Sequence, residues 1–75
     1  MGRRTDRMGL AKRSVTLAGH RTSVALEPEF WAALDSIAAS QGCSVAALMA
    51  EVDAARPPGQ ALASALRITA LRSRS

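Results

Sequence analysis

The sequence predicts a small, mostly α-helical domain that opens with a short β-strand. Residues 21–26 alternate polar and apolar side chains with the period of two that is typical of a strand. The two segments that follow, on either side of Gly42, carry apolar side chains at helical spacing. A further segment of this kind comes after Pro57-Pro58-Gly59 and predicts a short third, C-terminal helix.

The predicted strand has one apolar face, which contains Val24 and Leu26. A second alternation of the same period runs over residues 14–17 and leaves two arrangements open. In one, residues 14–17 pair with the strand in a hairpin that turns at Gly19. In the other, only the segment from Arg21 onward is a strand, and the residues before it form an extended arm.

Helix boundaries are marked by residues with a capping role. Pro28 fits a first helical position, and Glu27 and Glu29 fit the positive end of a helix dipole. Gly42 suits the C-terminal cap of this helix, and Ser44 suits the N-cap of the next one. The expected buried stripes are Phe30, Leu34, Ile37 and Ala38 with Trp31 at the margin, then Val45, Leu48, Met49 and Val52, then Leu62, Ala65, Leu66 and Thr69.

The length of the chain, 75 residues, leaves room for one small domain. A chain of about 60 residues buries only about 60% of its unfolded surface, so domains of this size often need a disulfide, a metal or a partner. Cys43 is the only cysteine, which excludes a disulfide within the chain, and with His20 it is the only soft ligand. We therefore expect no metal and no cofactor, and a homodimer cored by aliphatic side chains.

Charge is unevenly distributed along the chain. Residues 1–21 hold six cations and one acid, residues 22–55 hold five acids and no Lys or Arg, and residues 56–75 hold four arginines and no acid. A basic arm beside a folded domain is a common electrostatic footprint of nucleic-acid binding. The alternative is a tail that only increases solubility.

Catalysis and membrane insertion are not expected. The single histidine, His20, is in a turn or an arm, and Cys43 in a tight turn is expected to be structural. No apolar run approaches the ~18 residues of a spanning helix, and no hydrophobic region follows the Arg3-Arg4 pair as it would in a twin-arginine signal. One cysteine suits a reducing cytoplasm.

A characteristic order of features runs through residues 21–55: a strand, an acidic helix start with proline, an apolar stripe, a Gly-x-Ser turn and a second stripe. It is carried by TSVALEPEFW at residues 22–31, by Leu34, Ile37 and Ala38, and by Gly42-Cys43-Ser44-Val45 with Leu48. This order resembles the ribbon-helix-helix superfamily of the Arc and MetJ repressors. The longer run KRSVTLAGHRTSVALEPEFW, residues 12–31, is similar to a bacterial subfamily of that fold.

The resemblance implies an intertwined homodimer. One strand from each chain would pair into an intermolecular antiparallel β-ribbon, and the helices would interlock beneath it. The outer face of the ribbon would enter the DNA major groove, which at about 12 Å admits two strands. The expected dimer core is Val24, Leu26, Phe30, Leu34, Ile37, Leu48 and Val52.

The resemblance also assigns the DNA contacts. Arg21, Ser23 and Ala25 would face base edges, with Arg21 on guanine and Ala25 at most on a thymine methyl group. Because Ser23 and Ala25 are short, base-specific affinity would depend on Arg21 and the arm. If residues 14–17 do fold back, a dimer sheet has four strands and is too wide for the groove. The protein would then use the fold for dimerisation or bind DNA by its arms. Phosphate contacts are expected from the amides of Ser44 and Val45 and from Lys12, Arg13, Arg3 and Arg4.

We expect three segments: a disordered basic arm at 1–11, the ribbon-helix-helix domain at 12–56, and a C-terminal helix and tail at 57–75. The expected function is that of a homodimeric DNA-binding protein, a transcriptional repressor in the bacterial cytoplasm, associated with the nucleoid. The alternative is a dimerisation or protein-interaction module, antitoxin-like or a scaffold, with a small protein partner bound through residues 57–75.

Overall fold

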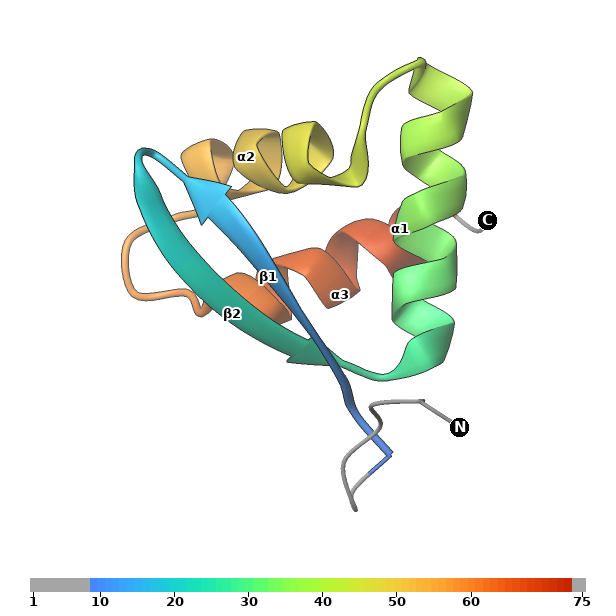
Figure 1. Cartoon of the computed structure of the whole chain (residues 1–75), viewed down its shortest axis with the longest axis horizontal. Helices are drawn as coiled ribbons and strands as arrows, with labels where there is room; N and C mark the ends of the chain where they lie inside the picture. The colour runs from blue at the N-terminus through green and yellow to red at the C-terminus, as the bar shows by residue number, and fades with distance from the viewer. Residues whose placement is uncertain (1–8, 74–75) are drawn as a thin grey trace.

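The computed structural model describes residues 9–73 and shows a β-hairpin followed by three helices (Figure 1). Strand β1 spans Ala11–Leu17 and strand β2 spans His20–Leu26. Helix α1 spans Pro28–Gln41, helix α2 spans Val45–Ala55, and helix α3 spans Leu62–Ser73. The predicted fold class, a mostly helical domain with a leading β element and a short third helix, is confirmed.

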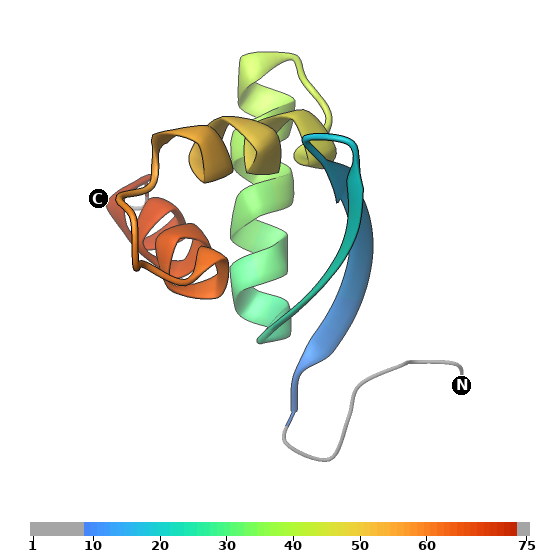
Figure 2. The ribbon, with the colours of Figure 1, turned by 90° about the vertical axis from the view of Figure 1, so that its left-hand side faces the viewer.

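The hairpin lies on one side of the molecule and α3 on the opposite side, with α1 and α2 between them (Figure 2). The inner face of the hairpin therefore packs on helices of its own chain. Within residues 9–73, no single helix is long and apolar enough to cross a membrane. Helices α1 and α2 reach that range only as a pair, and they are bent by 99° at the break between them.

Of the two arrangements that the alternation at residues 14–17 left open, the structure shows the hairpin and not the extended arm. Strands β1 and β2 pair antiparallel, from Ala11 opposite Leu26 to Leu17 opposite His20. The two-residue turn between them has positive φ at both positions, 52° at Ala18 and 81° at Gly19, which matches the twist of a tight hairpin. The ribbon in this structure is thus formed within one chain, and a turn this short closes at little entropic cost. The intermolecular ribbon stays a prediction.

The caps of α1 and α2 confirm the predicted boundaries. Pro28 is at the start of α1, and Gly42 ends it with a φ of 72°, in the left-handed region that glycine adopts readily. The amide of Gly42 donates to Ala39 O at 3.1 Å and that of Cys43 to Ala38 O at 2.9 Å. The Ser44 side chain then accepts from the Ala47 amide at 3.0 Å and caps α2. These two caps set the sharp turn between the helices.

Trp31 is a fully buried member of the core, so its predicted place at the margin of the stripe is wrong. Its side chain is 2% exposed, and the indole Nε1 donates to Ala11 O at 2.7 Å. The sequence pattern of α1 alone could not show this, because β1 provides both the cover and the acceptor. The other buried side chains of the same core cluster are Val15, Leu17, Val24, Leu26, Leu34, Ala38, Leu48, Met49, Leu66 and Ala70.

Helix α3 belongs to this core. Ala65, Leu66 and Ala70 are buried, whereas Thr69, expected on the buried face, is half-buried and donates its hydroxyl to Ala65 O at 2.9 Å. The hairpin and α3 thus cover α1 and α2 within one chain.

The residues predicted as a dimer core divide into two groups. Val24, Leu26, Leu34 and Leu48 are buried within the single chain. Phe30, Ile37 and Val52 are half-buried and pack at the edge of that core.

Candidate nucleic-acid interface

The hairpin has an inner and an outer face that differ in chemistry. On the inner face Val15, Leu17, Val24 and Leu26 are buried against the helices. Six side chains alternate with the inward-facing residues along the two strands and form the outer face, called the ribbon face below. The ribbon face consists of Lys12, Ser14 and Thr16 from β1 and Arg21, Ser23 and Ala25 from β2.

The predicted base-contacting residues all lie on the ribbon face. Arg21 and Ser23 are exposed, and Ala25 is half-buried. No ion pair holds Arg21 to any other part of residues 9–73. Its guanidinium is therefore available to a ligand, and its five N–H donors in a planar fork match acceptor pairs such as guanine O6 and N7.

Strand β1 adds a second row of side chains to the ribbon face. Of these side chains, the sequence assigned a DNA contact only to Lys12 and missed Ser14 and Thr16. Ser14 lies opposite Ser23, Thr16 opposite Arg21, and Lys12 opposite Ala25. All three side chains of the β1 row are exposed. The alternation over residues 14–17 was the signal that could have found Ser14 and Thr16, once the hairpin was chosen over the extended arm.

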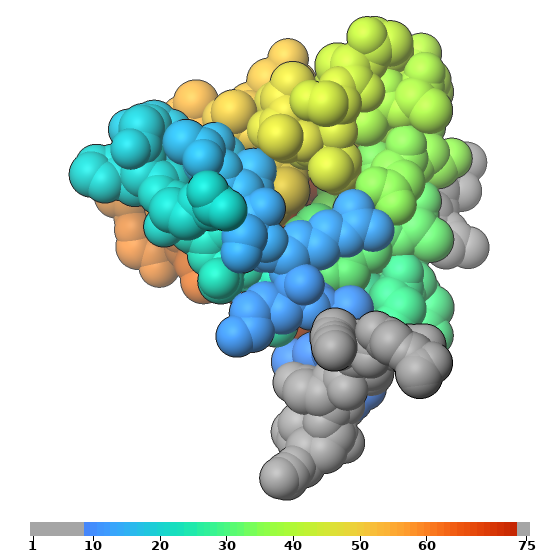
Figure 3. Space-filling view, viewed as in Figure 1, coloured from blue at the N-terminus to red at the C-terminus, as the bar shows by residue number. Residues whose placement is uncertain are grey.

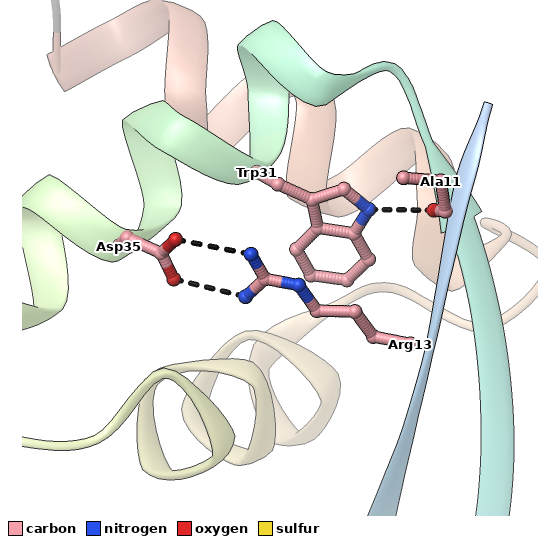
Figure 4. Close-up of polar contacts among 4 residues, drawn as sticks. All are labelled: Ala11, Arg13, Trp31 and Asp35. Atoms are coloured by element: carbon pink, nitrogen blue, oxygen red, sulfur yellow. Dashed lines mark hydrogen bonds and ion pairs between the residues drawn. The ribbon is translucent and has the colours of Figure 1, made fainter. Parts of the chain in front are cut away.

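Arg13, expected to contact phosphate, points to the helix side of the sheet (Figure 4). Its guanidinium makes two parallel hydrogen bonds to the Asp35 carboxylate, at 3.0 and 3.1 Å. It also lies over the Trp31 ring, 4.5 Å from the centroid. The hydrogen bond with Asp35 raises the pKa of Arg13 above its ordinary value. The structure therefore gives Arg13 a role in holding β1 on α1, and it leaves Lys12 as the cation on the outer side of β1.

The start of α2 provides the other predicted phosphate contacts, at Ser44 and Val45. Ser44 is exposed and Val45 is half-buried. The amides of the first helical turn have no acceptor within the helix, and the Ser44 side chain satisfies only that of Ala47. Figure 3 shows the hairpin and α2 side by side on one face of the molecule. Arg3 and Arg4, also expected on phosphate, lie outside the described residues.

Acidic side chains of residues 9–73 are all on or beside the helices. Residues 11–26 contain Lys12, Arg13 and Arg21 and no acid. Glu27 binds Arg67 and Asp53 binds Arg56, at 3.0 and 2.8 Å. The positive charge of the hairpin is therefore not neutralised on its outer face.

Other side chains that could act in catalysis or bind a metal do not assemble into a site in the described part of the chain. His20 is exposed beside the hairpin turn, and Cys43 is half-buried after the cap of α1. In residues 9–73, no three His, Cys, Asp or Glu side chains are grouped so that they could hold a metal ion. A shallow groove of about 590 Å³ runs between α2 and α3. Its lining is half apolar and half polar, and the polar side chains are Gln41, Glu51, Arg56, Gln60, Thr69 and Arg72.

These features define a class of protein: a small domain in which a two-stranded ribbon with exposed cations rests on three helices. A comparison with family models matches residues 10–73 to the ribbon-helix-helix domain. The chain therefore belongs to this family, and the match extends over both β1 and α3. The comparisons with curated proteins and with solved structures gave no match. Ribbon-helix-helix domains are typically DNA-binding transcription regulators or antitoxins, typically form dimers, and are generally not enzymes.

Proposed function

We propose that this protein binds double-stranded DNA as a homodimer and represses transcription on the bacterial nucleoid. One observation carries the proposal: the ribbon face is exposed at every position except the half-buried Ala25, bears two cations and contains no acid. A β-ribbon of two strands fits the major groove, whereas a sheet of four strands would be too wide. Base edges in that groove present donors and acceptors in a sequence-dependent pattern. Membership of a family whose domains typically bind DNA supports the same conclusion.

In this proposal the β2 row reads bases. Arg21 pairs with guanine O6 and N7, Ser23 bonds to either partner of a base pair, and Ala25 touches a thymine methyl group. Lys12 and the free amides at Ser44 and Val45 contact phosphates. Arg13 acts indirectly, by holding β1 in place.

The experiment begins with a randomised DNA duplex pool, from which the purified protein selects a preferred sequence. Fluorescence anisotropy over a salt series then compares the selected duplex with a scrambled one. A preference that persists at about 0.15 M salt supports sequence reading, because non-specific phosphate binding falls steeply with salt. Equal affinities for the two duplexes would contradict the proposal.

Arg21→Ala tests the role of the central residue. We expect it to weaken binding to the selected duplex by about 1–3 kcal/mol more than binding to the scrambled one. Arg72→Ala, which removes an exposed cation from α3, is the matched control and should not change the preference. An unchanged preference in Arg21→Ala would show that Arg21 does not read a base.

A protein-interaction module, antitoxin-like or a scaffold, is the second candidate, and the surface of α3 is the observation that favours it. Ile68 is 43% exposed and Leu71 is 59% exposed, and Ile68 lies in the groove between α2 and α3. Ile68→Ser should abolish co-purification of a small protein partner and leave DNA binding intact if this surface is the partner site.

A further inference from the structure

Helix α3 carries apolar side chains that the packing of the single chain leaves exposed. Within residues 9–73, the large apolar side chains that are exposed are Ile68, at 43%, and Leu71, at 59%. Both belong to α3, which lies on the side of the molecule opposite the hairpin (Figure 2). Because single exposed apolar side chains are ordinary on protein surfaces, the surroundings of each decide whether it marks a contact site.

Ile68 differs from Leu71 in its surroundings, because Ile68 lines the groove between α2 and α3 and Leu71 does not. Buried Leu48 and Ala65 line the same groove, and half-buried Val52 lines it from α2. Ile68 is therefore part of a continuous apolar strip that both helices contribute and that is open at the surface.

The charges of the groove indicate what can occupy it. Glu51 of α2 and Arg72 of α3 both line it, so the two helices contribute opposite charges. A surface that meets its own copy across a twofold axis must carry both partners of each contact. With this lining, Glu51 of one chain can face the partner's Arg72, whereas a surface of one sign would repel its copy.

The size of the chain also favours a second copy as the occupant. A domain of 75 residues gains a limited core from its own chain, and ribbon-helix-helix domains typically form dimers. Val52, which we predicted in the dimer core, is half-buried and lines this groove. A stable interface buries about 800 Å² on each partner, so the contact has to include both helices and not Ile68 alone.

From these observations we infer that a second copy of the chain docks in the groove between α2 and α3, and that α3 is part of the dimer interface. The inference rests on the homodimer of the proposed function, for which it names the surface. It does not depend on which strands form the ribbon. Contact at α3 leaves the ribbon face open to DNA, since the hairpin lies on the opposite side (Figure 2).

The first test compares Ile68→Ser with Leu71→Ser by sedimentation equilibrium over a range of protein concentrations. The two residues are three positions apart on α3, and only Ile68 lines the groove. We expect Ile68→Ser to raise the Kd of the dimer at least about tenfold, and Leu71→Ser to change it by about twofold or less. Circular dichroism and thermal unfolding confirm that both variants fold, as expected for changes at exposed positions.

The second test needs no substitution. Methyl NMR signals of wild-type protein are followed from concentrations above the Kd of the dimer to concentrations below it. We expect the signals of Ile68 and Val52 to shift as the dimer dissociates, and that of Leu71 to stay in place. Signals of Ile68 and Val52 that do not change across the transition would overturn the inference.

The outcomes separate the inference from the proposed function. If wild-type protein is a monomer at every concentration, the proposed homodimer and the inference both fail. If wild-type protein is a dimer and Ile68→Ser keeps its Kd, the homodimer stands and the groove is rejected as its interface. An equal loss in Leu71→Ser would move the contact to the outer surface of α3 and would also overturn the inference. Loss of a small protein partner in Ile68→Ser, with the Kd of the dimer unchanged, would assign the groove to that partner instead.

Discussion

Trp31 is the residue that most directly links the sequence to the shape of the hairpin. As the single tryptophan it fills the space between β1 and α1, and its one polar atom donates to Ala11 O. The Arg13 guanidinium lies over one face of the indole ring, and Asp35 holds it there by hydrogen bonding. Since the Arg13–Asp35 pair is half-exposed, we attribute most of the stabilisation to burial of the indole, and less to the ion pair.

Trp31→Phe keeps an aromatic ring and removes the indole N–H. The Ala11 carbonyl then loses its partner and part of the core volume is lost, so we expect destabilisation of about 1–3 kcal/mol. Urea unfolding followed by circular dichroism measures the change. Trp31→Ala, which removes the ring as well, should lose more, about 3–5 kcal/mol. A wild-type midpoint for Trp31→Phe would mean that the hydrogen bond does not anchor β1.

At the scale of elements, the hairpin turn has an avoidable local strain. Ala18 has a φ of 52°, a left-handed conformation that costs a residue with a Cβ about 1–2 kcal/mol. Gly19 has a φ of 81° and open space around its missing Cβ, so its requirement is conformational and not steric. The turn is tight enough to set the register of the whole ribbon face.

Ala18→Asn places at this position a residue that tolerates positive φ and creates the Asn-Gly sequence favoured in two-residue hairpins. We expect stabilisation of about 0.5–1 kcal/mol, seen as a higher midpoint of thermal or chemical unfolding. Gly19→Ala is the opposing control and should destabilise by about 1 kcal/mol. A decrease in stability for Ala18→Asn would contradict the assigned turn geometry.

At the scale of the whole molecule, the ion pair between Glu27 and Arg67 joins the β2–α1 junction to α3. Glu27 follows β2 and precedes α1, and it accepts a hydrogen bond from Arg67 Nε of α3 at 3.0 Å. This bond holds the pKa of Glu27 below its ordinary value of 4.5. A lowered carboxyl pKa in the folded state gives stability that is present above the pKa of the unfolded chain and is lost as the pH falls through the folded value.

Glu27→Gln should therefore make the free energy of unfolding depend less steeply on pH in the acidic range. Above about pH 4.5 the variant is less stable than wild-type protein, and the difference shrinks as the pH falls through the lowered pKa. Urea unfolding midpoints measured from neutral to acidic pH test this. Glu29→Gln, an exposed acid in the first turn of α1, is the matched control. Parallel profiles for wild-type protein and Glu27→Gln would exclude a role for the pair in acid sensitivity.

The sequence by itself determined the helices and their limits, and the outward positions of Arg21 and Ser23. Proline at a helix start, Gly42 and Ser44 act through local backbone geometry, and alternation in a strand is equally local. These features are readable without knowing what packs against them. They also carried the resemblance that the family match over residues 10–73 later confirmed.

Only the tertiary structure decided which segment pairs with β2, which side of β1 faces the helices, and what covers the core. Arg13 is on the helix side because Trp31 and Asp35, far along the chain, meet it there. Helix α3 is part of the core because Leu66 and Ala70 are buried in the same cluster as side chains of the hairpin, α1 and α2. Such contacts join residues distant in sequence, and a local pattern does not specify its partner. The length and composition predicted that the short helices need further apolar cover, and the three-dimensional packing shows how much of it the hairpin and α3 provide within the chain.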